Sequence, residues 1–396
     1  MSSATRLSVQ YVLLFGATGV SLPFAGLWMR SEGFSGAEIS AVLAAPMLGR
    51  LVTGPVLAVW ADGFRTRRAP IAWLGVVASA AYAGAALVDG FWPRLALWFV
   101  AATAASTLIP LTDVLNLRLA RREGYGFALP RGCGSAAFVL ANVCMGAILT
   151  GAAPVWVIGW VVAASLLIAL WAAFGLPSEP VEEGGPSAGL ERFRGLGRLL
   201  GDARFRLMVL AVGCVQAAHA FYYGFSALLW RQQGATETAT GLFWGFSVVV
   251  EIGFMWWVEP WRRRRGVSPE TLLLVGCGAA VVRWGAMALQ PPLWSVWGLQ
   301  ALHALSFAAT YLASVELVER LAPRESQTAA QTLNSVVSSG VLIGLATLAS
   351  GPLFDRFGAA GYAAMALLAF LGGLLAMALK RLGSGARAGG QVPRHG

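Results

Sequence analysis

Several ionisable residues stand inside long apolar stretches of this sequence, where charged groups are rare. They are Arg50, Asp113, Arg131, His219, Glu251, Arg283 and His303. An ionisable side chain in apolar surroundings costs several kcal/mol unless it is paired or hydrated, so each one is a candidate for function. Together they offer a carboxyl group that can carry a proton and guanidinium groups that can bind an anion.

Glu251 is the strongest candidate for a proton carrier. Burial disfavours the charged form of a carboxyl group, so such a group can load and release a proton when its surroundings change. The alternative is a static partner for Arg283 or Arg50, and the two interpretations can hold at different stages of one cycle. We predict that Glu251 and Arg283 take part in proton coupling.

His219 and His303 are expected at similar depth, near the midplane, in the seventh and tenth apolar stretches. The imidazole titrates near neutral pH, which suits a proton relay, and we predict proton coupling for His219 and substrate binding for His303. The alternative for each is a core histidine that only makes hydrogen bonds. No third metal-ligating residue lies nearby in the sequence, so we expect no metal and no other cofactor.

Asp113 and Arg131 lie on consecutive apolar stretches at matching depth, which predicts an ion pair. The pair either locks two helices together or lies on a substrate path. Arg50 is the candidate for holding a substrate carboxylate, because a guanidinium matches a carboxylate with two hydrogen bonds. Internal pairing with Glu251 is the alternative for Arg50.

Three aromatic residues, Tyr222, Tyr223 and Trp244, accompany these charges. Ligand pockets are mostly apolar with few polar groups, so these rings are candidates for the wall that holds a substrate ring. Ordinary core packing explains them equally well.

The composition decides which kind of protein must position these groups. Of the 396 residues, 57% are hydrophobic and 12% are charged, whereas soluble domains carry roughly 25% charged residues. The mean hydropathy of +0.66 excludes a soluble enzyme and a disordered chain. The net charge of +10 does not indicate nucleic acid, because the arginines lie between apolar runs. The sequence predicts an integral protein of the lipid bilayer.

A membrane-spanning helix needs about 20 apolar residues. Runs of this kind predict an all-α fold with twelve transmembrane helices in two six-helix bundles. The runs are residues 7–29, 37–61, 70–88, 95–117, 126–149, 154–176, 207–230, 238–258, 270–290, 293–315, 329–352 and 359–379.

The polar segments between the runs predict the domains and the orientation. We expect a first bundle at 1–176, a cytoplasmic linker at 177–206, a second bundle at 207–380 and a cytoplasmic tail at 381–396. Arginines concentrate in alternate connecting segments, which places both termini in the cytoplasm.

An internal repeat supports two related halves. Trp60, Asp62 and Arg65 at the end of the second span recur as Trp257, Glu259 and Arg262 at the end of the eighth, half a chain length away. We predict that Asp62, Arg65, Glu259 and Arg262 gate the conformational change.

A repeat of six spans is the layout of the major facilitator carriers, and the loop at 62–68 (DGFRTRR) resembles their signature, with Gly63 where a basic residue is usual. Other segments are similar to the phenylpropionate permease family, distantly related to the lactose permease group of proton symporters. They are residues 110–113 (PLTD), 131–135 (RGCGS), 216–226 (QAAHAFYYGFS), 282–285 (VRWG) and 302–303 (LH).

The resemblance implies roles for matching residues. The lactose permease group has an acid and an arginine bound to substrate at the places of Asp113 and Arg131, and an acid at its site in the place of Glu251. In the phenylpropionate permease family an arginine recurs at the position of Arg50, and the substrates are aromatic carboxylates.

We therefore expect a proton-coupled symporter that imports a small aromatic carboxylate by alternating access. Protonation of Glu251 would free an arginine for the substrate anion. The alternatives are a carrier of a neutral solute, such as a sugar or nucleoside, and an exporter that exchanges solute for protons. An enzyme is not expected, because no span contains a nucleophile–base set or a metal-ligand motif such as HExxH. ATP is not expected to drive transport, because the sequence has no GxxxxGK[ST]. We expect a monomer in a bacterial inner membrane.

Overall fold

The structure is a computed structural model that describes residues 1–181, 196–323 and 326–388. Helices dominate these ranges, and within them β-structure is confined to one isolated bridge between Thr66 and Pro180. The inner part of the predicted linker and the last residues of the predicted tail lie outside the described residues. The all-α prediction is confirmed.

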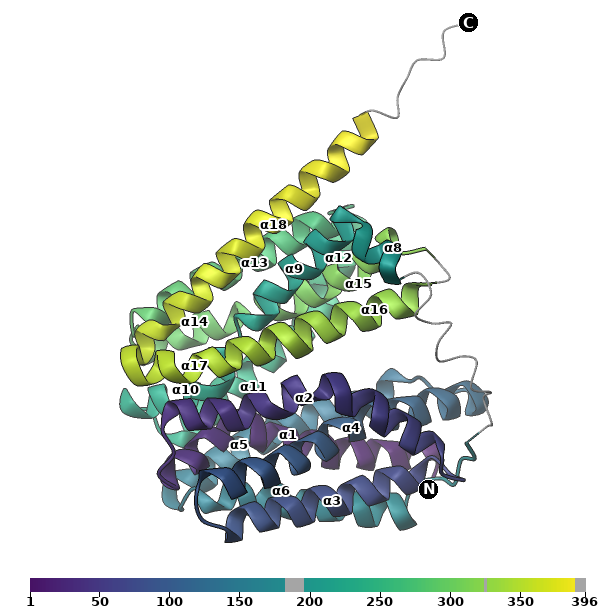
Figure 1. The fold of residues 1–396 in the computed structure, drawn as a ribbon, viewed down its shortest axis with the longest axis vertical. Helices are drawn as coiled ribbons and strands as arrows, with labels where there is room; N and C mark the ends of the chain where they lie inside the picture. The colour runs from purple at the N-terminus through teal and green to yellow at the C-terminus, as the bar shows by residue number, and fades with distance from the viewer. Residues whose placement is uncertain (182–195, 324–325, 389–396) are drawn as a thin grey trace, which may run out of the picture. The chain divides into compact units, whose positions relative to one another are not determined.

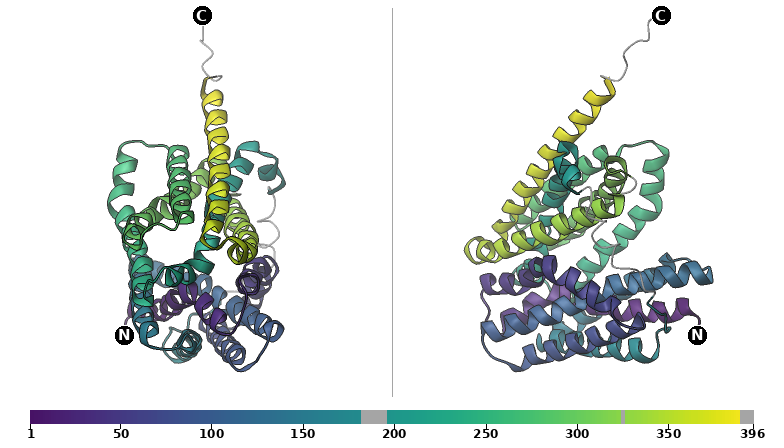
Figure 2. Two further views of the ribbon diagram at one scale, coloured as in Figure 1. Left: turned by 90° about the vertical axis from the view of Figure 1, so that its left-hand side faces the viewer. Right: turned by 45° about the vertical axis from the view of Figure 1, so that its right-hand side comes forward.

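The first six spans are continuous α-helices that run side by side (Figures 1 and 2). Local signals set their ends: Ser35 and Glu38 form a capping box at the start of the second helix, and Gly124, with φ +76°, ends the fourth. The helices are α1 (Ser3–Ser31), α2 (Gly36–Asp62), α3 (Arg68–Leu87), α4 (Phe91–Glu123), α5 (Ala128–Gly151) and α6 (Val155–Phe174).

A short helix, α8 (Leu196–Gly201), precedes the seventh span. Spans seven to nine contain α9 (Ala203–Ala217), α10 (Ala220–Gln232), α11 (Glu237–Gly253), η1 (Phe254–Val258), α12 (Glu259–Arg264) and α13 (Pro269–Ala288). Spans ten to twelve contain η2 (Leu293–Ser295), α14 (Val296–Ala301), η3 (Ala304–Ala309), α15 (Thr310–Leu321), α16 (Gln327–Val336), η5 (Val337–Leu342), α17 (Ile343–Phe357), η6 (Gly358–Gly361) and α18 (Tyr362–Ala388).

Eleven helical segments of the described chain are long and apolar enough to cross a membrane. The last of them, Ala329–Leu382, has 54 residues, which would extend about 80 Å as one straight helix. One crossing needs about 30 Å, and the 3₁₀ turn η6 divides this segment between α17 and α18. With this division, the described residues account for the twelve predicted spans of a multi-pass membrane protein.

The internal repeat extends to the packing of the helices. In the first half α1 packs against α5 and α6, α3 against α4 and α6, and α2 against α4. The same pairs recur six spans later: α9 packs against η5 and α18, α13 against α15 and α18, and η1 against η3. Corresponding spans in the two halves therefore pack against corresponding neighbours.

The chain forms two compact units. The first comprises Met1–Glu183, Tyr222–Val248 and Thr347–Gly358, and the second comprises Gly184–Phe221, Val249–Ala346 and Ala359–Gly396. The domain boundaries expected at 1–176, 177–206, 207–380 and 381–396 stay a prediction, because they follow the chain and not these compact units.

Tight contacts join the parts of the first unit. The carboxylate of Asp355 in α17 accepts hydrogen bonds of 2.8 Å from the backbone N–H groups of Gly36 and Ala37, at the start of α2. These N–H groups have no partner inside their own helix, and a carboxylate suits the positive end of the helix dipole. The hydroxyl of Ser40 also donates to the carbonyl of Leu348.

Candidate functional site

A buried hydrogen-bond network in the second unit centres on Arg283 of α13. Its side chain is 0% exposed. One terminal nitrogen, Nη2, donates to Oε1 of Gln300 at 2.6 Å, and the other, Nη1, donates to Nδ1 of His303 at 2.9 Å and to Oγ of Ser306 at 3.3 Å. The guanidinium carbon lies 4.4 Å from the ring centre of Trp284. Span ten therefore supplies three polar partners for one buried cation.

Hydrogen-bond partners in this network indicate which ring nitrogen of each histidine carries a hydrogen. A guanidinium can only donate, so Nδ1 of His303 accepts and its Nε2 carries the hydrogen. In His219 the order is reversed, because Nδ1 lies 3.0 Å from the carbonyl oxygen of Val215, which can only accept. In a neutral His219, Nε2 then accepts from the hydroxyl of Ser306 at 3.2 Å. The bond from Arg283 requires a neutral imidazole at His303.

Glu251 lies at the more exposed end of the same hydrogen-bond network. Its Oε2 atom is 3.8 Å from Nε2 of His303, the nitrogen that carries the hydrogen, and its side chain is 17% exposed. The chain of contacts runs from Glu251 through His303 to Arg283, and through Ser306 to His219. The predicted proton-coupling residues Glu251, His219 and Arg283 thus gather in one place with His303.

Interruptions of the helices position these groups. His219 lies between α9 and α10, where the seventh span breaks. His303 immediately precedes the π-helix η3, which contains Ser306, and Glu251 lies three residues before the π-helix η1. Short π-helical segments inside α-helices are frequent at functional sites, because the extra residue in a turn shifts the side chains that follow it.

A second polar cluster lies in the first unit, around the predicted pair of Asp113 and Arg131. Nη1 of Arg131 donates to both carboxylate oxygens of Asp113, at 2.5 and 2.6 Å. The Tyr11 hydroxyl donates to Oδ1 of Asp113 at 2.6 Å and accepts from the side-chain amide of Asn116 at 3.4 Å. The Asp113 and Arg131 side chains are 29% and 41% exposed. The predicted ion pair is present, and its position is partly open.

Arg50 lies near the middle of the 27-residue helix α2, and it is exposed. Within the described part of the chain its guanidinium makes no ion pair and no hydrogen bond. A bare charge at this depth facing lipid is costly, which favours a position on a hydrated path.

The three predicted aromatic residues lie together in the first unit. Tyr222 and Trp244 stack with ring centres 4.4 Å apart and are 0% and 3% exposed, and the Trp244 indole donates to the Ser226 hydroxyl. Tyr223 packs beside them and is partly exposed. Tyr222 and Trp244 are packed core residues, and Tyr223 is the partly exposed member of the group.

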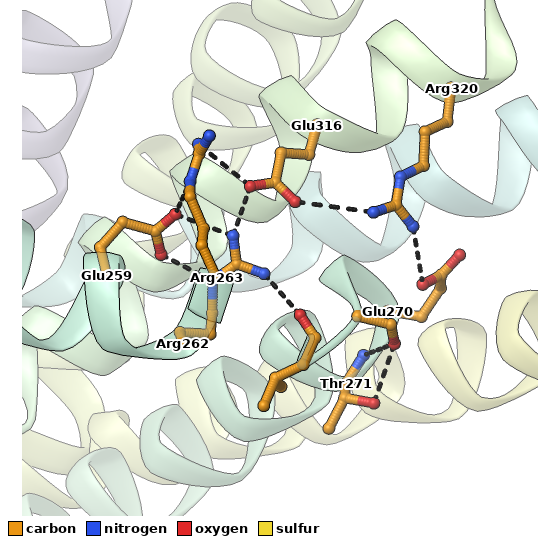
Figure 3. Close-up of polar contacts among 9 residues, drawn as sticks. Glu259, Arg262, Arg263, Glu270, Thr271, Glu316 and Arg320 are labelled. Carbon is orange, nitrogen blue, oxygen red and sulfur yellow. Dashed lines mark hydrogen bonds and ion pairs between the residues drawn. The ribbon is translucent and has the colours of Figure 1, made fainter. Parts of the chain in front are cut away.

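The two copies of the predicted gating signature differ. Asp62 and Arg65 are exposed, and their side chains form no ion pair within the described residues. In the second copy, Glu259 accepts from Arg262 at 2.7 and 2.8 Å. Arg262 also pairs with Glu316, whose carboxylate lies between the arginines of α12 and Arg320 (Figure 3).

Sequence reasoning missed Tyr11, Gln300 and Ser306. Gln300, His303 and Ser306 follow one another at intervals of three residues, which places them on one face of a helix, so the sequence contained a signal for this group. Tyr11 carries no such signal, because its partner Asp113 is 102 residues away. The described residues contain no group of three or more His, Cys, Asp or Glu side chains that could hold a metal ion.

Comparison with known proteins agrees with this architecture. The MFS_1 like family profile matches residues 4–363. Maltose permease of Geobacillus stearothermophilus is 29% identical over 354 residues, which cover 88% of this chain and 86% of the relative. The probable 3-phenylpropionic acid transporter of Escherichia coli (strain K12) is 28% identical over 383 residues, which cover 93% and 96%.

Solved structures share the fold at low sequence identity. The nucleoside transporter NupG superposes with a TM-score of 0.81 at 16% identity, covering 96% of this chain and 99% of that structure. A D-xylose–proton symporter gives a TM-score of 0.70 at 14% identity, covering 94% and 96%. At these identities the likeness concerns the fold alone.

Proposed function

The chain belongs to the MFS_1 like family and is a secondary transporter of the major facilitator superfamily, and on that premise we propose that it couples import of a small aromatic carboxylate to import of a proton. The bilayer surrounds it, and its substrate is a small molecule. The observation that carries the proposal is the line of contacts from the carboxyl group of Glu251 through His303 to the buried Arg283.

The proposed coupling follows from charge. The Glu251 carboxylate offsets part of the positive charge of Arg283 through the polarised ring of His303. When Glu251 takes up a proton this compensation is lost, and the anionic solute restores it. One proton and one monocarboxylate then cross together without net charge. Neutral His303 and His219 keep Arg283 in place during this exchange, since a proton on Nδ1 of His303 would break its bond with Arg283.

The anionic solute is supported by Arg50. This exposed guanidinium lies mid-span in α2 and makes no ion pair within the described residues. A guanidinium binds a carboxylate with two parallel hydrogen bonds. The relative that is a probable 3-phenylpropionic acid transporter supports an aromatic acid, and the partly exposed ring of Tyr223 offers a surface for its ring.

A neutral solute is the second candidate. Maltose permease is as similar to this chain as the acid transporter. The half-exposed cluster of Asp113, Arg131 and Tyr11 supports this alternative, because a carboxylate and a guanidinium side by side can accept from and donate to sugar hydroxyls. Export in exchange for protons would use the same groups in the opposite direction.

The proposal also includes a setting for the transporter. We place it in the cytoplasmic membrane of a bacterium as a monomer, with both termini on the cytoplasmic side. The distribution of arginines among the connecting segments supports this orientation.

Transport by proteoliposomes tests the proposal. An inward proton gradient should drive accumulation of labelled 3-phenylpropionate and not of labelled maltose. Glu251→Gln should abolish the gradient-driven accumulation while exchange of labelled for unlabelled solute continues, because the amide cannot release a proton. The matched control is Glu237→Gln in the first turn of the same helix α11, whose carboxylate pairs with Arg231.

Two results would overturn parts of the proposal. Solute accumulation that does not depend on the proton gradient would exclude proton coupling. Gradient-driven accumulation of maltose without the acid would replace the carboxylate by the neutral solute.

A further inference from the structure

The end of span eight carries an exposed group of aromatic and basic side chains. Trp256, Trp257 and Trp261 are 72%, 70% and 50% exposed, and the exposed residues Arg263, Arg264 and Arg265 follow. Tryptophan is enriched where a membrane helix meets the headgroups. Basic residues just beyond a span attract anionic lipids, with roughly 1 kcal/mol for each charge near the surface. This segment therefore lies where lipid phosphates are found.

A cavity of about 330 Å³ opens beside this segment. This volume falls in the range of about 300–1,000 Å³ that is typical of small-ligand sites. Its walls come from the ends of spans eight and ten and the turn after span eight. The lining residues are Arg262, Arg263, Gly266, Val267, Glu316, Glu319 and Arg320.

The lining arginines differ in how completely they are used. Arg262 is 4% exposed and is held by Glu259, by Glu316 and by the carbonyl of Val267. Arg263 also contacts Glu259 and Glu316, but its side chain is 61% exposed. Arg262 is therefore a buried residue that links spans eight and ten, whereas Arg263 presents N–H donors to the cavity.

Arg320 is held more loosely than the other two. Its guanidinium nitrogens lie 3.8 Å from Glu270 and 4.0 Å from Glu316 (Figure 3), and its side chain is 49% exposed. Both distances exceed that of a hydrogen bond. The two carboxylates therefore orient the Arg320 guanidinium electrostatically without accepting its hydrogen bonds, and its N–H groups remain available to an anion.

We propose that this cavity, with the exposed arginines of span eight, binds the phosphate of an anionic phospholipid. Arg263 and Arg320 would donate to the phosphate oxygens, with Arg264 and Arg265 close by, and the exposed tryptophans would lie along the glycerol and upper acyl region. A guanidinium suits the planar, bidentate recognition of phosphate. Glu319 in the lining disfavours a second negative charge, which favours a singly charged phosphodiester. The site is independent of the transported solute.

Lipid titration of the purified protein in detergent tests this site. Phosphatidylglycerol should bind and raise the melting temperature, whereas phosphatidylcholine should not. In the double variant Arg263→Gln with Arg320→Gln, phosphatidylglycerol should bind roughly 30-fold more weakly, because two charged donors to the bound phosphate are lost at roughly 1 kcal/mol each. The matched control is Arg121→Gln with Arg381→Gln, two exposed arginines at the ends of other spans, which should keep the wild-type affinity.

The remaining arms identify the ligand and the binding mode. Inorganic phosphate that protects the wild type as well as phosphatidylglycerol does would replace the lipid by a free anion. Equal protection by phosphatidylethanolamine would replace the anionic lipid by a zwitterionic one. An equal loss in the control variant would show a general charge effect and overturn the site. Counting bound lipids by native mass spectrometry gives the same comparison for any variant whose melting temperature changes.

Discussion

In the first half of the molecule Asp62 and Arg65 are exposed and form no ion pair within the described residues, whereas in the second half Glu259 and Arg262 are buried in a network with Glu316. The two pairs occupy the same place in the internal repeat. The same sequence signature thus forms an exposed loop in the first copy. In the second copy it forms ion pairs that join spans eight and ten. Glu316 on span ten is one source of the difference, because it pairs with Arg262, whereas among the described residues span four supplies no ion pair to Arg65.

The backbones of the two halves differ in the same sense. Helices α1 to α6 are uninterrupted, while span seven breaks at His219 and spans eight, ten and eleven contain the π-helices η1, η3 and η5. The polar groups follow this division. The second half buries Arg283 among side chains at these breaks, and the first half leaves Arg50 and Arg131 exposed or partly exposed. The second half thus holds the groups proposed for proton coupling, and the first half adds Arg50 and Arg131 as proposed contacts for the solute.

The largest difference between the halves should be seen in stability. Arg262→Ala leaves the buried carboxylate of Glu259 with Arg263 alone, and the partly buried carboxylate of Glu316 with Arg263 and the longer contact to Arg320. We therefore expect a loss of about 3 kcal/mol in the free energy of unfolding, at the low end for a broken buried ion pair. Arg65→Ala at the matching position should cost less than about 0.5 kcal/mol, as exposed substitutions usually do. Chemical denaturation in detergent measures both. Equal losses would show that the first copy has a hidden partner and would remove the contrast.

The next effect concerns solute binding in the first half. Arg50→Gln should weaken binding of an aromatic carboxylate by roughly 10- to 100-fold, because a hydrogen bond to a charged group is worth about 1.5–3 kcal/mol. Arg50→Lys keeps the charge but loses the fork, so its affinity should fall between the two.

Isothermal titration with a carboxylate and with its amide separates the contributions to that effect. The amide should bind wild type and Arg50→Gln equally, because it carries no charge for Arg50 to meet. If Arg50→Gln weakens both solutes alike, Arg50 supports the fold and does not recognise the carboxylate.

How far the sequence predicts this molecule depends on the range of the interaction. The spans and the all-α class follow from local hydropathy, and the pair of Asp113 and Arg131 follows from two consecutive antiparallel spans that place both residues at matching depth. The contact of His219 with Ser306 was not predictable in this way, since the residues are 87 positions apart. Nor does hydropathy show where a helix becomes a π-helix, because that depends on packing against other spans. Gln300 and Ser306 could have been found from their spacing around His303.

The smallest expected effect tests whether the buried network of the second half acts as a unit. The Ser306 hydroxyl accepts from Arg283 and is hydrogen-bonded to Nε2 of His219, so Ser306→Ala leaves two buried polar groups without this partner. We expect a loss of about 1–2 kcal/mol in the free energy of unfolding.

Ser314→Ala is the matched control, because that buried hydroxyl donates only to the carbonyl of Tyr311 in its own helix, and it should be nearly neutral. A structural role alone would lower stability and leave transport per folded molecule unchanged. If Ser306 holds Arg283 and His219 for coupling, Ser306→Ala should also lower gradient-driven accumulation relative to exchange in the same proteoliposomes. Unchanged ratios in both serine variants would confine coupling to Glu251, His303 and Arg283, and the second half would then contain a smaller functional unit than its buried network.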